Sequence, residues 1–112
     1  MRVREIMDRR HPFIYEDKLA TKARATIRDF TLRILPVVNE NRRLLDIVSR
    51  GNVMTFSCSV MKASVNAVKS HIRVSEAAGL MISRGVGRIP VKDDKGKLVG
   101  VIDREDVARL LV

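Results

Sequence analysis

The residues best placed for chemistry are polar side chains that follow two β-prone runs, one in each half of the chain. Asp103 and Asp106 lie three positions apart at the expected start of a short helix, and Ser49 and Asn52 repeat that spacing earlier in the chain. The first turn of a helix has backbone N–H groups without partners and carries the positive end of the helix dipole, so it attracts a phosphate. The same residue types also serve as helix caps, and both roles are compatible.

Residue types that would indicate an enzyme do not form a pattern in this sequence. The single cysteine, Cys58, excludes an internal disulfide and cannot make a structural metal site by itself, and His11 and His71 have no metal-ligand spacing. The sequence has no recognisable nucleophile–base pair and no Walker-type glycine loop. We therefore predict a protein without catalytic residues, without a metal and without a required cofactor.

An internal repeat with a period of 54 residues organises the chain. Without any gap, Met7 falls on Met61 and Pro36 falls on Pro90, and similar apolar residues occupy many of the positions between them. A repeat of this length is typical of one supersecondary unit that cannot bury its hydrophobic face alone. We expect two repeats, 1–55 and 56–112, that pack against each other with pseudo-twofold symmetry.

Each repeat has the order strand, helix, strand, strand, helix, which predicts an α+β fold. In the second repeat, we expect strands over 65–69, 88–91 and 98–102, a helix over 75–84 between Ser75 as N-cap and Gly85 as stop, and a last helix over 104–110. In the first repeat, the corresponding segments are 13–16, 34–38 and 44–49, a helix over 21–30, and a short helix from Arg50, with 55–59 as a linker. The hairpin loop at 39–42 lacks glycine, and we expect asparagine to take its left-handed position.

Composition and charge narrow the class of partner. Hydrophobic residues make up 46% and charged residues 31% of the sequence, which is typical of a soluble globular protein. No apolar run approaches the roughly 20 residues that span a bilayer, and the N-terminus lacks the pattern of a signal peptide, so we predict a cytoplasmic protein. The net charge of +9 indicates anionic partners, which are nucleotides, nucleic acid or an acidic protein surface.

Two segments of the second repeat resemble the CBS (cystathionine-β-synthase) domain family. They are Gly87-Arg88-Ile89-Pro90-Val91 and the run from Leu98 to Val107, and the first repeat matches in outline through Leu35-Pro36-Val37-Val38 and 46–53. The sequence departs from the family at Asp103, where a hydroxyl residue is usual, and at Asn52, where aspartate is usual. The resemblance covers essentially the whole chain as a pair of CBS domains, often called a Bateman module.

The resemblance implies a non-catalytic regulatory module that binds AMP, ADP, ATP or S-adenosylmethionine in the cleft between its repeats. In the second repeat it implies Asp106 as the ribose contact, Arg88 as the phosphate partner, and Ile89, Pro90 and Val68 beside the base. In the first repeat it implies Asn52, Leu35, Pro36 and Ile14, with Arg33 as the basic residue and Ser49 as the hydroxyl. Asp103 repels phosphate unless a cation offsets it, so the second site is expected to prefer ligands with few phosphates, and the uncharged Asn52 predicts a weaker or empty first site.

Several alternatives remain open at this level. Pro36 and Pro90 fit strands with one unpaired edge, and Arg33 and Arg88 fit ordinary surface charges. Family resemblance also predicts a homodimer, with its surface supplied by Ile6, Met7, Val60 and Met61, and a regulated partner protein. The rival functions are nucleic-acid binding through the basic surface and a purely structural dimerisation module. The chain has three Phe, one Tyr and no Trp, so it lacks the aromatic side chains on which the bases of single-stranded nucleic acid stack.

Overall fold

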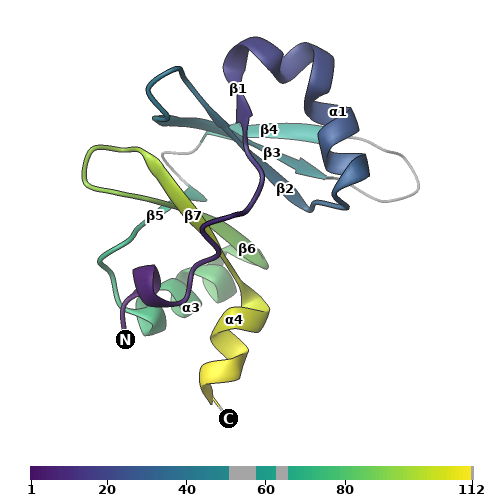
Figure 1. Ribbon diagram of the computed structural model, residues 1–112. Helices are drawn as coiled ribbons and strands as arrows, with labels where there is room; N and C mark the ends of the chain where they lie inside the picture. The colour runs from purple at the N-terminus through teal and green to yellow at the C-terminus, as the bar shows by residue number, and fades with distance from the viewer. Residues whose placement is uncertain (51–57, 63–65, 112) are drawn as a thin grey trace. The chain divides into compact units, whose positions relative to one another are not determined.

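The computed structural model describes residues 1–50, 58–62 and 66–111 of this chain. The helices and strands, labelled in Figure 1, are η1 (Val3–Glu5), β1 (Ile14–Tyr15), η2 (Glu16–Lys18), α1 (Leu19–Asp29), β2 (Ile34–Val38), β3 (Leu44–Arg50), β4 (Cys58–Lys62), β5 (Val68–Lys69), α3 (Val74–Arg84), β6 (Arg88–Lys92), β7 (Leu98–Asp103), α4 (Arg104–Ala108) and η3 (Arg109–Leu111). They form two compact units. Unit 1 consists of Met1–His11 and Ala67–Val112, and unit 2 is Pro12–Asn66.

The two sheets confirm the internal repeat and the α+β fold. In unit 2, β1 pairs in parallel with β2 and β2 pairs antiparallel with β3, and in unit 1 the strands β5, β6 and β7 follow the same scheme. Even the irregularity in register between Val37 and Val38 recurs 54 positions later, between Val91 and Lys92. The 54-residue period of the sequence is thus a period of strand pairing.

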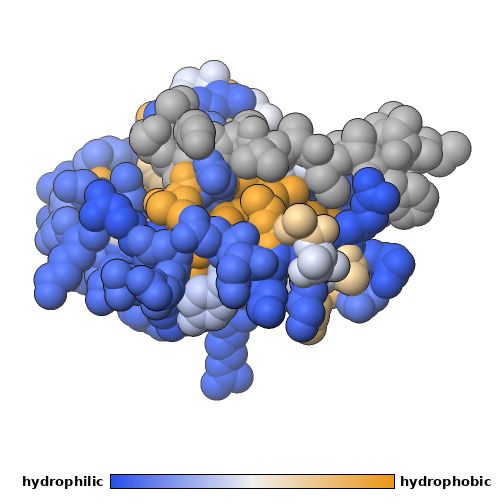
Figure 2. Space-filling model, turned by 90° about the horizontal axis from the view of Figure 1, so that it is seen from above, coloured by the Kyte–Doolittle hydropathy of each residue, from blue (hydrophilic) through white to orange (hydrophobic). Residues whose placement is uncertain are grey.

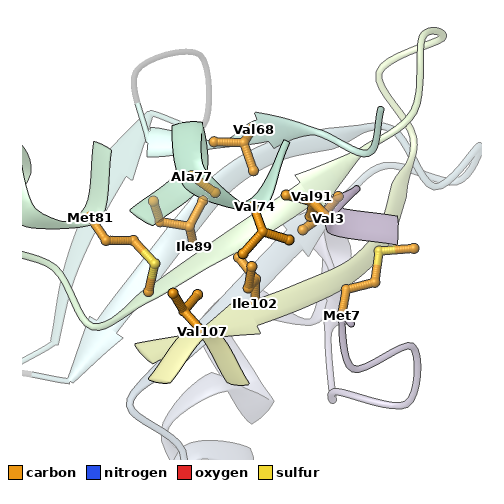
Figure 3. Packing of buried hydrophobic residues seen from close by; sticks show 10 residues of the cluster. All are labelled: Val3, Met7, Val68, Val74, Ala77, Met81, Ile89, Val91, Ile102 and Val107. Atoms are coloured by element: carbon orange, nitrogen blue, oxygen red, sulfur yellow. The ribbon is translucent and has the colours of Figure 1, made fainter. Parts of the chain in front are cut away.

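One helix layer covers one face of each sheet. In unit 1, α3 contributes Ala77 and Met81 to a hydrophobic cluster with Ile89 of β6 and Ile102 of β7, and Val107 of α4 completes that layer (Figure 3). In unit 2, Ile27 of α1 packs with Leu35 and Val48 of the sheet. The buried side chains of α3 recur every three or four residues, as expected for an amphipathic helix. On the strands they do not alternate, because every residue of β2 and three consecutive residues of β6 are buried, so these strands bury both faces.

The N-terminal segment Met1–His11 belongs to unit 1, together with the second repeat. The sequence pattern assigns it to the first repeat. Val3 donates its backbone N–H to the Ile72 carbonyl at 2.9 Å, and Asp8 and Val101 exchange two backbone hydrogen bonds of 2.8 and 3.0 Å. Val3 is fully buried and Met7 nearly so, within the cluster of Figure 3. Met7 is therefore a core residue, which corrects its predicted place on a dimer surface.

Gly100 of β7 allows this segment to approach the sheet. A Cβ atom at Gly100 would lie 2.9 Å from both the Asp8 carbonyl oxygen and the Met7 sulfur. Distances this short are steric clashes with backbone and with a buried side chain, so glycine is required here for close packing. The residue at the corresponding position of unit 2 is Asp46.

The expected linker at 55–59 is wrong for its last two residues. Residues Cys58–Lys62 form β4, which pairs antiparallel with β3 from Arg50 opposite Cys58 to Asp46 opposite Lys62. The short helix expected from Arg50 is also not observed at its first residue, because Arg50 ends β3, and the rest of that segment lies outside the described residues. Pairing with Cys58–Lys62 satisfies the backbone N–H and C=O groups along the edge of β3, which a local sequence pattern does not reveal.

The main helices begin one or two residues before their predicted starts. Helix α3 begins at Val74 after Arg73, so Ser75 is not its N-cap, but it ends as expected at Gly85, which is left-handed with φ of 65°. Helix α1 ends near Thr31, which also has a positive φ of 54°. Thr31 occupies the position of Gly85 in the repeat, so a β-branched residue adopts a conformation that favours glycine.

The two hairpin loops are built alike. The side-chain oxygen of Asn39 accepts backbone N–H bonds of 3.0 Å from Asn41 and Arg43, and Asp93 accepts equivalent bonds of 2.9 Å from Lys95 and Lys97. The left-handed residue of the second loop is Gly96 with φ of 81°.

In the first loop, the left-handed residue is Arg42 with φ of 66°, so the expectation of asparagine at that position is wrong. Asparagine supports this loop through its side chain instead. The Arg42 guanidinium lies 4.6 Å from the centre of the Phe13 ring, and this cation–π contact offsets part of the backbone strain.

Hydrophilic residues make up most of the surface drawn in Figure 2, and hydrophobic side chains are visible near its middle. Across the residues that the structure describes, we find no helix that is long and apolar enough to span a bilayer.

Candidate functional site

The junction of β6, β7 and α4 in unit 1 brings together the polar residues predicted from the sequence. Arg88 and Asp103 are direct partners across the antiparallel strands, and Asp103 precedes α4. The Arg88 Nη2 and Asp103 Oδ2 atoms are 3.7 Å apart, and both side chains are about one third exposed, at 31% and 29%. The pair is a solvent-accessible ion pair at the end of a buried sheet, so it remains available to a ligand.

Asp103 and Asp106 form a capping box at the start of α4. Asp103 Oδ1 accepts the Glu105 backbone N–H at 2.6 Å, and Asp106 Oδ2 accepts the Asp103 N–H at 3.2 Å. Arg104 donates its N–H to the Gly87 carbonyl at 2.8 Å. The structural alternative for Asp103 and Asp106 as caps is thus confirmed.

This cap corrects the expectation of a free phosphate site at the helix terminus. Two N–H groups of the first turn, those of Arg104 and Glu105, already have partners, and two carboxylates already compensate the positive dipole end. An additional anion would therefore gain little here. The helix itself has five residues, so its dipole is short.

Charges of both signs surround the second carboxylate. The other oxygen of Asp106 lies 3.9 Å from Arg109 Nη1, one turn further along the chain. Arg109 is largely exposed, whereas the Asp106 side chain is only 24% exposed. The site therefore combines two carboxylates with Arg88 and Arg109, and its local charge is close to neutral. Sequence reasoning missed Arg109, although its spacing of three from Asp106 on a helix was a usable signal.

The apolar residues predicted beside the base are buried. Val68 and Ile89 belong to the core cluster of unit 1 and are nearly inaccessible (Figure 3), and Pro90 is also fully buried. Because side chains alternate along a strand, Pro90 points to the face of β6 opposite Ile89. Packing explains why these positions are apolar, and their contact with a base stays a prediction.

Unit 2 reproduces the apolar part of this site but not its charges. Ile14, Leu35 and Pro36 are buried as Val68, Ile89 and Pro90 are. The cross-strand partner of Ser49 is Ile34, so Ile34, and not Arg33, takes the place that Arg88 has beside Asp103.

Arg33 instead takes the place of Gly87, since its carbonyl accepts the Arg50 N–H at 2.8 Å. It is exposed and lies one position away from its predicted role. Ser49 is half-buried in β3, and the Asn52 prediction lies outside the described residues. The positions of Arg88 and Asp103 are occupied in unit 2 by Ile34 and Ser49, which cannot form an ion pair.

Comparison with known proteins agrees with this architecture. The family model for the CBS domain matches the chain twice, over residues 3–59 and 57–112. A homoserine O-acetyltransferase of Methanococcoides burtonii is 30% identical over 116 residues, which cover 97% of this chain and 24% of that protein. The chain spans less than half the length of the curated relatives that it matches.

Solved structures share the fold at low sequence identity. The CBS domain pair of protein MJ0100, in complex with 5'-methylthioadenosine and S-adenosyl-L-methionine, has a TM-score of 0.80 and 19% identity, with 99% of this chain and 95% of that chain covered. Protein CBSX2 in complex with AMP has a TM-score of 0.76 and 22% identity, with 98% and 95% covered. With its family model matched over both repeats and its fold shared with CBS domain pairs, the chain belongs to the CBS domain family.

Proposed function

We propose that this chain is a regulatory CBS module that binds an adenosine ligand and has no catalytic activity of its own. Proteins of the same fold bind 5'-methylthioadenosine and S-adenosyl-L-methionine, or AMP. The observation that carries the proposal is the half-buried Asp106 beside the Arg88–Asp103 pair at the end of β7. The Asp106 side chain is 24% exposed, and a carboxylate can accept hydrogen bonds from both hydroxyls of a ribose.

The charges of this site favour ligands with few phosphates. Asp103 lies 3.7 Å from Arg88, so the charge of Arg88 is partly neutralised before a phosphate binds. A polyphosphate would meet two carboxylates at short range, which is unfavourable. We therefore place methylthioadenosine, S-adenosylmethionine and AMP ahead of ADP and ATP.

A thermal-shift panel with these five ligands tests the proposal. A ligand at about 100 times its Kd stabilises the fold by roughly 2.7 kcal/mol, which is a clear shift for a domain of this size. The informative variant is Asp106→Asn, because asparagine has the same shape and also stands at position 52 of the first repeat. Loss of the carboxylate charge should weaken binding about tenfold or more.

The matched control is Glu105→Gln, which removes the same charge from the neighbouring, exposed residue of α4. It should leave the ligand response unchanged. A response to ATP larger than that to the other ligands would contradict the charge argument, and equal responses of wild type and Asp106→Asn would remove Asp106 from the site.

Nucleic-acid binding is the second candidate, favoured by the outer face of α1. Arg24 and Arg28, four residues apart, are exposed on one side of that helix. An affinity for RNA or DNA that falls steeply with salt and ignores adenosine ligands would support it. The predicted homodimer and the cytoplasmic location stay predictions, and sedimentation equilibrium tests the first of them.

A further inference from the structure

Four lysines gather at one end of the sheet in unit 1, where a loop joins β6 to β7. Lys69 of β5 and Lys92 of β6 are direct partners across the parallel strands, and Lys95 and Lys97 belong to the loop itself. The loop lies at the end of β7 away from α4 (Figure 1). Lys92 is half-buried and the other three are exposed. We call these four residues the hairpin lysines.

The docked N-terminal segment adds two arginines beside the hairpin lysines. Arg4 donates its backbone N–H to the Ser70 carbonyl at 3.0 Å, and Ser70 donates its own N–H to the Lys92 carbonyl at 2.9 Å. The guanidinium of Arg9 donates to the Arg4 carbonyl at 3.1 Å. Both arginines are exposed. The N-terminal segment, β5 and the loop after β6 therefore carry cations side by side.

The acidic side chains of this loop already have partners. Asp93 accepts two backbone N–H bonds of 2.9 Å from within the loop, and Asp94 lies 3.4 Å from His71 Nδ1. Among the residues that the structure describes, none of the hairpin lysines forms an ion pair with a carboxylate. Four lysines and two arginines outnumber these two carboxylates, so the surface keeps a positive charge.

The pairing of Lys69 with Lys92 is unfavourable for folding. Neighbouring strands are about 4.8 Å apart, so the positive charges of two partnered lysines repel each other. Unit 2 has Tyr15 and Val38 at the matching positions, and these residues are also partners across parallel strands. Folding therefore gives no reason for lysine at these two positions, whereas binding of an anion does.

The chemistry of this surface favours a partner that is recognised by its charge alone. Lysine is depleted at the buried centre of protein–protein interfaces, and binding in a membrane interface is strengthened by apolar side chains that insert into the lipid. The large hydrophobic side chains that the structure shows exposed lie outside β5 and the β6–β7 hairpin. Nucleic acid fits such a surface, because its phosphate backbone supplies essentially all of non-specific affinity through lysine and arginine contacts.

A duplex suits this surface better than a single strand. Bases of a single strand stack on aromatic side chains, and neither the hairpin nor β5 contains an aromatic residue. A two-stranded β-ribbon, such as the end of β6 and β7, fits the major groove of DNA. We propose that the hairpin lysines bind the phosphate backbone of double-stranded DNA without sequence preference, and that Arg4 and Arg9 extend the contact.

This proposal shares its class of partner with the second candidate function but rests on a different surface. The hairpin lysines belong to unit 1, whereas the outer face of α1 belongs to unit 2. It is also independent of the adenosine ligand, because Lys92 and Arg88 stand at opposite ends of β6. Variants of the three surfaces therefore give separate answers.

Fluorescence anisotropy with a short labelled DNA duplex tests the proposal. Four phosphate contacts predict a slope of about −3 to −4 when the logarithm of the affinity is plotted against that of the salt concentration. A second duplex of unrelated sequence should bind with the same affinity. No binding at low salt with about 100 μM protein, or an affinity that salt does not change, overturns the proposal.

Two double variants locate the contact. Lys95→Gln/Lys97→Gln should weaken duplex binding at least about tenfold at low salt and make the salt slope shallower by about two. Lys69→Gln/Lys92→Gln should weaken binding similarly, and it should also raise the melting temperature because it removes the repulsion across the strands. A purely structural role of these two lysines predicts the opposite shift. Unchanged duplex affinity in both variants overturns the proposal.

The matched control is Arg24→Gln/Arg28→Gln, which removes the same two charges from the outer face of α1 in unit 2. Because the net charge changes equally, a general electrostatic attraction would weaken equally in this control. The proposal predicts that the affinity and the salt slope stay as in the wild type. Loss of duplex binding in this control, with none in the lysine variants, overturns the proposal and assigns DNA binding to α1.

Two other anionic probes separate the rival partners. Tighter binding of a polyglutamate peptide than of the duplex would assign the hairpin lysines to an acidic protein, and binding of phosphatidylserine vesicles without binding of the duplex would assign them to a membrane. Either result overturns the proposal. Asp106→Asn should retain the duplex affinity, so failure of the adenosine proposal leaves this test intact.

Discussion

Helices α1 and α3 occupy equivalent places in the two units and present different outer faces. The buried positions match, since Ala23 and Ile27 of α1 correspond to Ala77 and Met81 of α3. The outer positions differ, because Arg24 and Arg28 stand where α3 has Ala78 and Ile82. The core fixes one pattern for both copies, whereas the surface allows one helix to be cationic and the other apolar.

The left-handed positions differ between the units in the same way. Unit 1 has Gly85 after α3 and Gly96 in its hairpin, and unit 2 has Thr31 and Arg42 at the matching sites, all with positive φ. A left-handed residue with a Cβ atom costs roughly 1–2 kcal/mol. Strand pairing and helix packing of unit 2 impose the backbone path despite this cost, so local preference is a weaker constraint than tertiary packing.

The largest effect is expected at Gly100, where unit 2 has Asp46. Gly100→Ala places a Cβ atom against the Asp8 carbonyl and the Met7 sulfur, and both belong to the docked N-terminal segment. Overpacking of this kind costs about 1–3 kcal/mol. Urea unfolding should show that loss.

The control for this variant is Gly79→Ala, on the exposed side of α3, where nothing lies within 4 Å. Alanine in a helix is favoured over glycine by about 1 kcal/mol, so this variant should be slightly more stable than wild type. If Gly100→Ala were as stable as wild type, the close approach of the N-terminal segment would be wrong.

The next largest effect is expected from exchanging Gly85, which follows α3, and Thr31, which follows α1. Gly85→Thr should destabilise unit 1 by about 1–2 kcal/mol, because threonine is strained at φ of 65°. Thr31→Gly should stabilise unit 2 by less than about 1 kcal/mol, because glycine also gains entropy in the unfolded chain. Thermal unfolding should show a lower melting temperature for Gly85→Thr and a higher one for Thr31→Gly. Shifts of the melting temperature in the same direction would refute the comparison.

Arg42→Gly refines this comparison, because glycine relieves the positive φ but removes the contact with Phe13. That cation–π contact is worth about 0.5–1 kcal/mol at an exposed site. The net change should therefore be smaller than that of Thr31→Gly. An equal gain from both would mean that the Phe13 contact contributes nothing.

The smallest effect is a pH dependence confined to one hairpin. The backbone N–H of Lys97 is the main cause that lowers the pKa of Asp93 below its ordinary value. Burial opposes this lowering, and the backbone N–H of Lys95 and the positive charges of both lysines add to it. Because the folded-state pKa is depressed, this contribution is present above the unfolded pKa of about 3.9 and is lost as pH falls through the folded value.

Asp93→Asn gives unit 1 the uncharged residue that unit 2 has at Asn39, which accepts the same two backbone bonds. The difference in stability between wild type and Asp93→Asn should therefore shrink as pH falls below about 4. Denaturant midpoints from pH 7 to pH 2 measure it. A difference that stays constant over that range would show that the charge of Asp93 does not matter.

The sequence by itself determined the repeat, the family and most strands. The period of 54 residues appears in the apolar positions because each copy buries the same side chains. The strand Ile34–Val38 was predicted without error because it is a short continuous apolar run, which is typical of a strand buried on both faces. Asp103 and Asp106 were found together because capping and ligand contact require the same residue types at the same spacing. Local rules of this kind act within a few residues of the chain.

Only the tertiary structure decided which segment pairs with each sheet edge and which charged side chains form ion pairs. The docking of Met1–His11 on unit 1 joins segments far apart in sequence, and β4 pairs with a strand that ends eight positions before it. In neither case does the local sequence pattern identify the partner. The pairing of Arg88 with Asp103 follows from strand register, which also excludes Arg33 from that role. Burial and backbone hydrogen bonding are satisfied only by the whole fold, and they select among arrangements that the local sequence leaves equally favourable.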